Sequence, residues 1–186
     1  MIRHGETDAN KLFVVQGRMD NPLNDHGREQ AHQTGTFLRE NNLHFDVIVS
    51  SPLKRAYETA TIICKELRDQ KAVLAQAGFM ERNFGDFDGR KIDDEYANLV
   101  TNDAIHGMEK NKDLERRVFD NLNQIVERYP DKTILLITHS HVIKSVLVNL
   151  VKDFTYTSYL FNCSISVLTH DQGTYKVIDY NINPLK

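Results

Sequence analysis

Residues 133–138 have the sequence Thr133-Ile134-Leu135-Leu136-Ile137-Thr138, and His139 follows them directly. Four consecutive aliphatic residues between polar ends are typical of a central strand in a parallel sheet, because helices cover such a strand on both faces. In open α/β sheets, ligands bind beyond the carboxyl ends of the parallel strands. The sequence therefore places His139 at the edge of the sheet where a functional site is expected.

Helical and strand patterns alternate on both sides of this stretch. Residues 46–50 form a short β-branched run, which predicts a second strand. It ends at Ser51-Pro52, which we interpret as a helix N-cap followed by proline at the first helical position. Apolar residues then recur every three or four positions over 53–67, which predicts an amphipathic helix.

The rest of the chain continues the alternation. Further helices are expected over residues 25–40, 113–129 and 142–151, and a hairpin over 164–169 and 175–180. This order predicts an α/β fold, a three-layer α/β/α sandwich with a mostly parallel central sheet. No repeat or linker divides the sequence, so we expect one domain over residues 1–186, with a short lid insertion at about 90–112.

The composition excludes several classes of protein. The chain has 186 residues, of which 40% are hydrophobic and 26% charged, as in an ordinary globular domain. A formal net charge of −3 gives nucleic acid and anionic membranes no general electrostatic attraction, so we expect neither as a partner.

The cysteines and the apolar runs bear on the cellular compartment. Cys64 lies in a helical pattern and Cys163 in a strand pattern, which favours buried reduced thiols, although a single disulfide stays open as the alternative. No apolar run approaches the roughly 18 residues of a membrane-spanning helix, and no signal peptide is recognised. We therefore expect a cytoplasmic protein, either a monomer or a homodimer.

A charged motif stands near the N-terminus, Arg3-His4-Gly5-Glu6-Thr7, and Asn10, Gln16 and Gly17 follow it in a polar loop. Alone, an Arg-His pair is more often a surface charge beside a structural histidine than a catalytic pair. Few residues precede Arg3, so the first strand is either short or begins upstream of Met1.

Three other segments carry groups that can bind phosphate. Arg55 lies in the first turn of a predicted helix, where anions are favoured. Glu81 lies in a glycine-bearing loop at 80–89, although its alternative interpretation is an exposed carboxylate. His139-Ser140-His141 ends the central strand. No third ligand with metal-site spacing accompanies His139 and His141, so we interpret His141 as lining the start of the next helix.

Taken together, these motifs resemble the histidine phosphatase superfamily, also called phosphoglycerate-mutase-like. The resemblance rests on the Arg-His-Gly opening, the Ser-x-Leu-x-Arg-Ala-x-x-Thr-Ala block at residues 51–60 and the late second histidine, and it spans nearly the whole chain. Ser140 replaces a glycine that is frequent in the family, and Asp88 replaces a glutamate before Gly89. Neither departure removes a reacting group.

The resemblance implies a role for each residue. His4 would be the nucleophile, Glu81 the proton donor and later the base, and His139 a donor to the transferring phosphoryl group. Arg3 and Arg55 would clamp phosphoryl oxygens in place of a metal ion, so neither a metal nor another cofactor is expected. Further substrate contacts are expected from Asn10, Gln16, Gly17 and Ser140.

The reaction favoured by the sequence is hydrolysis of small phosphomonoesters, such as phosphoglycerates or sugar phosphates, by an acid-type phosphatase of this superfamily. The short lid and the segment Asn83-Phe84-Gly85-Asp86-Phe87-Asp88-Gly89 resemble phosphatase members. A phosphoglycerate mutase is the alternative, and an inactive adaptor that binds phosphorylated ligands is a weaker one. Specificity is expected from the 92–108 lid and from Phe13, Met80, Phe84 and Phe87, although each of these four side chains could equally belong to the core.

Overall fold

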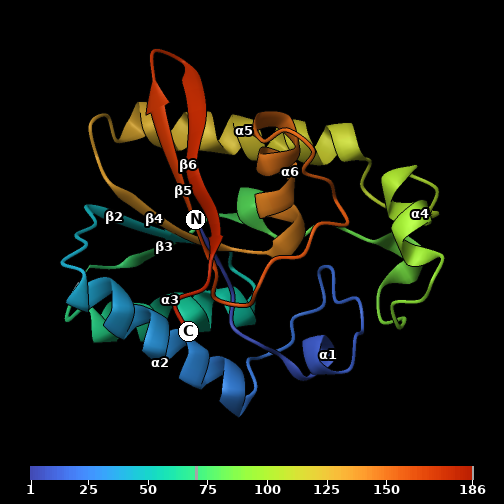
Figure 1. The fold of residues 1–186 in the computed structure, drawn as a ribbon, viewed down its shortest axis with the longest axis horizontal. Helices are drawn as coiled ribbons and strands as arrows, with labels where there is room; N and C mark the ends of the chain where they lie inside the picture. Colours follow the sequence, from blue (N-terminus) through green and yellow to red (C-terminus); the bar gives the residue numbers. More distant parts are fainter. Residues whose placement is uncertain (70, 186) are drawn as a thin grey trace.

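The computed structural model describes residues 1–69 and 71–185, and its centre is a six-stranded sheet with the order β3-β2-β4-β1-β5-β6 (Figure 1). The strands from β3 to β1 in this order are parallel, and β5 and β6 continue the sheet as an antiparallel hairpin. The bounds are β1 Ile2–Arg3, β2 Val47–Ser50, β3 Val73–Ala75, β4 Ile134–Thr138, β5 Ile165–Asp171 and β6 Thr174–Ile182.

Helices cover both faces of the sheet. Figure 1 shows α2 and α3 on one face and α5 and α6 on the other, with α4 at one end of the molecule. The helices are α1 Asp8–Lys11, α2 Asp25–Glu40, α3 Lys54–Glu66, α4 Tyr96–Thr101, α5 Asn111–Arg128 and α6 Ser140–Leu150, with 3₁₀ turns η1 Ala77–Phe79 and η2 Gly85–Phe87. The predicted three-layer fold with a mostly parallel sheet is confirmed.

The continuous apolar run of β4 serves both layers, because successive side chains of a strand point to opposite faces. Leu135 and Ile137 lie in the cluster that includes residues of α2 and α3. Leu136 lies in the other cluster, with residues of α5 and α6. Burial on both faces explains why this strand shows no alternation of polar and apolar residues.

The predicted start of α3 is wrong. The helix begins at Lys54, and its N-cap position is Leu53, which makes no side-chain capping bond. The Ser51 hydroxyl accepts a bond from the Leu53 N–H at 3.3 Å and also contacts His139, so it lies in the turn before the helix. The helices α5 and α6 also begin earlier than predicted, at Asn111 and Ser140.

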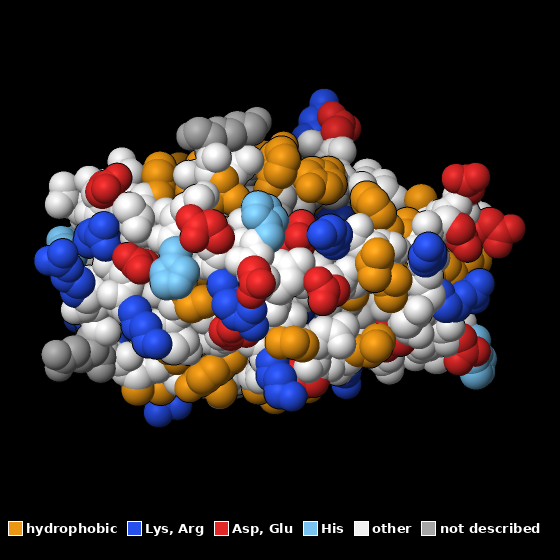
Figure 2. All heavy atoms as spheres, turned by 90° about the horizontal axis from the view of Figure 1, so that it is seen from below, with side chains coloured by type: hydrophobic (Ala, Val, Ile, Leu, Met, Phe, Trp, Pro, Cys, Tyr) orange, Lys and Arg blue, Asp and Glu red, His pale blue; other side chains and the backbone are white. Residues whose placement is uncertain are grey.

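Other expectations concern single side chains and the surface. Cys64 and Cys163 are free and buried, as predicted. The face in Figure 2, seen from below the view of Figure 1, intersperses positive and negative side chains. Within the described residues, no helix is both long and apolar enough to cross a membrane.

Candidate active site

The two motif histidines meet because their strands are neighbours. β1 pairs with β4 in parallel, with Arg3 opposite Thr138, so both strands deliver the next residue to the same edge of the sheet. The His4 N–H donates to the Thr138 carbonyl at 2.9 Å. The rings of His4 and His139 lie 5.2 Å apart between centroids, in an edge-on arrangement.

The surroundings of His4 select one tautomer. Its Nδ1 lies 2.7 Å from the Gly5 carbonyl oxygen, which can only accept, so Nδ1 carries the proton. Its Nε2 faces the Nε–H of Arg55 at 3.3 Å, which requires a lone pair on Nε2. Burial, followed by the charges of Arg55 and Arg3, lowers the His4 pKa well below 6.5. At neutral pH the side chain is therefore a neutral imidazole with its lone pair on Nε2.

Arg55 is held by the loop that precedes α2. Its side chain is buried, and its two terminal nitrogens donate to the carbonyls of Met19 and Gly17 at 2.6 and 2.7 Å. Burial lowers its pKa to about 10, so the guanidinium stays charged at neutral pH. Arg3 donates to the Leu160 carbonyl through Nη1, whereas its buried Nε has no partner in the described part of the chain.

His139 is completely buried behind His4. Its Nε2 lies 2.7 Å from the Ser51 hydroxyl, and its Nδ1 has no partner within residues 1–69 and 71–185. Burial, followed by the charge of Arg55, lowers its pKa well below 6.5, so this ring is also neutral. One ring nitrogen of a neutral imidazole carries hydrogen, and Nδ1 is the ring nitrogen of His139 that has no partner among the described residues.

Glu81 reaches the site from the segment that follows η1. Its side chain is buried, with Oε1 accepting from the Arg82 N–H at 2.8 Å and Oε2 from the His141 N–H at 3.3 Å. The second bond comes from the first turn of α6, where backbone N–H groups have no partner inside the helix. The two backbone bonds therefore fix the direction of the carboxylate.

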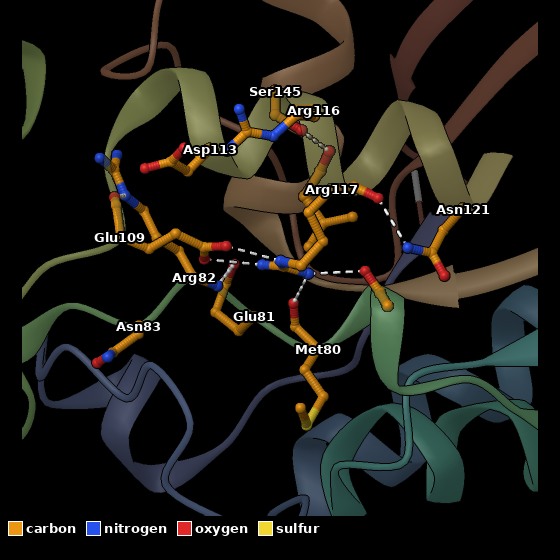
Figure 3. A network of polar contacts seen from close by, with 12 residues as sticks. Met80, Glu81, Arg82, Asn83, Glu109, Asp113, Arg116, Arg117, Asn121 and Ser145 are labelled. Atoms are coloured by element: carbon orange, nitrogen blue, oxygen red, sulfur yellow. Dashed lines mark hydrogen bonds and ion pairs between the residues drawn. The ribbon is translucent and has the colours of Figure 1, made fainter. Parts of the chain in front are cut away.

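Arg117 of α5 holds the segment that carries Glu81 (Figure 3). Its Nη1 donates to the carbonyls of Gly78 and Met80 at 2.7 and 3.0 Å. The same guanidinium makes two parallel bonds to the Glu109 carboxylate, at 2.7 and 2.8 Å. Such paired bonds restrict direction as well as distance, so they anchor the backbone next to Glu81 on α5.

The polar loop after His4 supplies amide groups. The side-chain Oε1 of Gln16 accepts from Thr7 Oγ1 at 2.9 Å, and the side-chain Oδ1 of Asn10 accepts from the Thr7 N–H at 3.2 Å. The NH₂ groups of Asn10 and Gln16 make no bond within the described residues, so they are free to donate. Gly17 has a φ of +41°, and a Cβ there would lie 2.0 Å from Asp88 Oδ1.

These groups surround a cavity of about 600 Å³, a size suited to a small metabolite. Its wall includes most of the predicted site residues, namely Arg3, His4, Asn10, Gln16, Gly17, Arg55, Glu81 and Ser140. His139 lies behind the wall. Phe13 and Phe84 line the cavity, whereas Phe87 packs in the core and Met80 lies outside the wall, which corrects the expectation for these two.

Several residues of the wall were not predicted from the sequence, Lys144 and Asn162 among them. Lys144, on α6, lines the cavity, and so does Asn162. The Asn162 side-chain amide donates to the His4 backbone carbonyl at 3.0 Å and to the side-chain Oδ1 of Asn10 at 3.3 Å. Asn162 lies in an irregular loop without a sequence signal. His141 lies in the first turn of α6, as predicted, and also lines the cavity. No cluster of three or more His, Cys, Asp or Glu side chains suited to a metal ion occurs in residues 1–69 and 71–185.

Comparison with known proteins identifies the family. Residues 1–183 match the sequence model of the Histidine phosphatase superfamily (branch 1). The chain is 32% identical to the uncharacterized phosphatase PhoE of Bacillus subtilis, covering 98% of this chain and 93% of the relative. It is 27% identical to a broad-specificity phosphatase of Saccharomyces cerevisiae, with 91% and 78% covered.

A solved structure and a second group of relatives agree with this assignment. A phosphoserine phosphatase mutant from Entamoeba histolytica, in complex with phosphoserine, superposes with a TM-score of 0.85 at 25% identity, covering 100% of this chain and 97% of the other. Phosphoglycerate mutases are also relatives. The chain therefore belongs to the histidine phosphatase superfamily, as an enzyme related to both its phosphatases and its phosphoglycerate mutases.

Proposed function

We propose that this protein is a phosphatase that hydrolyses small phosphomonoesters through a phosphohistidine on His4. The observation that carries the proposal is the neutral His4 imidazole, whose Nε2 lone pair lies beside the Arg55 guanidinium in the wall of the cavity. An unprotonated imidazole next to fixed positive charge is suited to attack a phosphoryl group whose oxygens those charges bind.

In the first half-reaction, Nε2 attacks phosphorus, a P–N bond forms and the P–O bond to the leaving group breaks. Glu81 is the proton donor to the leaving oxygen. Arg3 and Arg55 bind the phosphoryl oxygens and compensate their charge, with the NH₂ groups of Asn10 and Gln16 as further donors. The Nδ1–H of His139 donates a hydrogen bond to the remaining phosphoryl oxygen.

In the second half-reaction, water attacks the phosphorus of the phosphohistidine. The Glu81 carboxylate accepts a proton from this water, the P–N bond breaks, and neutral His4 and inorganic phosphate are released. Glu81 ends the cycle protonated, ready for the next leaving group. Residues 90–112, which include α4, would act as a lid, since Ile92, Tyr96 and Ala97 line the cavity.

Phosphatases and phosphoglycerate mutases are both matched over most of their length. Hydrolysis is favoured because the 32% identical relative is a phosphatase, whereas the mutase matched over most of its length is 29% identical. Rapid quenching with a radiolabelled phosphomonoester tests the proposal. Wild type should retain an acid-labile label, and His4→Ala should retain none. With 3-phosphoglycerate, phosphate release should exceed isomerisation, both with and without a bisphosphoglycerate. Faster isomerisation would support the mutase alternative instead.

A further inference from the structure

Lys144 is a buried cation in the cavity wall that the proposed reaction does not use. Its side chain is 9% exposed, and its ammonium donates to the Tyr156 carbonyl at 2.7 Å. That is its one hydrogen bond within the described residues, and no carboxylate among them lies within 4.0 Å of it. An ammonium has three N–H donors, so two remain unused.

A buried charge without a counter-ion is unfavourable, and such groups are normally paired. Burial, followed by repulsion from Arg3, lowers the pKa of Lys144 to about 8, whereas Glu81 opposes this shift. The ammonium is therefore still mostly charged at neutral pH. Lys144 lines the same cavity as Arg3 and Glu81, so it lies near the reacting groups.

We propose that Lys144 binds a carboxylate of the substrate, so that the preferred substrates are small phosphomonoesters that carry a carboxylate. This inference rests on the proposed phosphatase function and specifies its substrate class. Arg3 and Arg55 are committed to the phosphoryl group, so the ammonium of Lys144 is left for a second anionic group. Two free N–H donors on a compact ammonium match one carboxylate.

The neighbours of Lys144 support a monovalent ligand rather than a second phosphoryl dianion. Lys144 carries one positive charge, which compensates one carboxylate but not a second phosphoryl dianion. Glu81, from the segment after η1, lines the same cavity. Arg3 faces it from β1. His141, on the same helix, is neutral, because burial and the charge of Lys144 lower its pKa well below 6.5. Tyr156 stays neutral because burial raises its pKa.

A pair of substrates that differ at one group tests this inference. We compare kcat/KM for 3-phosphoglycerate with kcat/KM for glycerol 3-phosphate, which has a hydroxymethyl group in place of the carboxylate. Wild type should favour 3-phosphoglycerate, and Lys144→Met should reduce this ratio about tenfold or more, as expected for loss of a charge-assisted bond. Lys152→Met is the control, because Lys152 follows α6, is exposed to solvent and lies outside the cavity wall.

The control should change the ratio less than about twofold. Equal losses with both substrates in Lys144→Met would overturn the inference, because Lys144 would then act on the phosphoryl group or on Glu81. If wild type turns over both substrates and the ratio of their kcat/KM values is near one, the carboxylate site is refuted but the proposed phosphatase function is not. If wild type turns over neither substrate and rapid quenching yields no labelled enzyme, the proposed function is refuted as well.

The pH dependence of the wild-type ratio provides a second test, which does not depend on the folding of a variant. Both substrates share the phosphoryl group and its ionisation, and the carboxylate is ionised throughout. Because Lys144 loses its proton near pH 8, the preference for 3-phosphoglycerate should decline between pH 7 and pH 9. A ratio that stays constant over this range would contradict the inference.

Discussion

Replacing Arg117 by methionine tests whether the segment that carries Glu81 depends on its anchor to α5. The substitution keeps much of the apolar stem but removes the bonds to Gly78 and Met80 and the paired bonds to Glu109. The Arg117 side chain is 19% exposed and that of Glu109 13%, so solvent replaces the lost bonds poorly.

The magnitude follows from this burial. Breaking a buried ion pair by removing one partner costs about 3–5 kcal/mol. Arg18 remains 3.9 Å from Glu109 and partly compensates its negative charge. We therefore expect a loss of about 2–4 kcal/mol in the free energy of unfolding. Arg116→Met is the matched control on the same helix. Its ion pair with Asp113 involves side chains 70% and 51% exposed, so its loss should cost less than about 1 kcal/mol.

Urea unfolding, followed by circular dichroism, gives the free energy of unfolding of both variants. Comparing kcat for two substrates with different leaving groups shows the effect on Glu81 as proton donor. An alkyl phosphate needs a proton on its leaving oxygen, whereas 4-nitrophenolate leaves readily without one. Arg117→Met should therefore lower kcat more for the alkyl phosphate. If it is no less stable than Arg116→Met and lowers both kcat values equally, Arg117 does not position Glu81.

Three other predictions concern the acid, the phosphate loop and pH. Glu81→Gln should lower kcat for an alkyl phosphate about 10²–10⁴-fold. The rate of the burst phase with 4-nitrophenyl phosphate should fall less, and equal losses with both substrates would argue against Glu81 as the proton donor. Gly17→Ala should raise KM for 4-nitrophenyl phosphate, because the added Cβ would lie 2.0 Å from Asp88 Oδ1 and displace the loop that binds Arg55. An unchanged KM for this substrate would contradict the prediction. The buried histidines of the site have pKa values well below the ordinary 6.5, so below that pH the unfolded chain binds protons that the folded chain does not. The contribution of these neutral rings to the free energy of unfolding should therefore be fully present above pH 6.5 and decline as the pH falls below it. A Tm that is constant from pH 7.5 to 5 would refute the assignment of neutral rings.

The parts of the fold that the sequence predicted are those encoded by local patterns. The aliphatic run of β4 and the helical period of α3 are each visible in a short window, so the layers and the sheet could be inferred from them. The site residues at the ends of β1 and β4 followed from the general rule for parallel strands. The structure brings His4 and His139 together because those two strands are neighbours.

The parts that could not be predicted depend on distant partners. Ser51 resembles an N-cap, but its hydroxyl contacts His139, 88 residues away in the chain. Lys144 fits the helical pattern of α6, and only the packing of that helix shows that it lines the cavity. Asn162 lies in an irregular loop whose path is fixed by tertiary contacts, such as its bond to the His4 carbonyl.

The central claim is that Nε2 of His4 receives the phosphoryl group, and locating the phosphorus on the trapped enzyme tests it most directly. Enzyme quenched during turnover, digested under alkaline conditions and analysed by tandem mass spectrometry and phosphorus NMR should show phosphate on Nε2 of His4. Phosphate on Nδ1 of that ring, on another residue, or on none during active turnover would contradict the account.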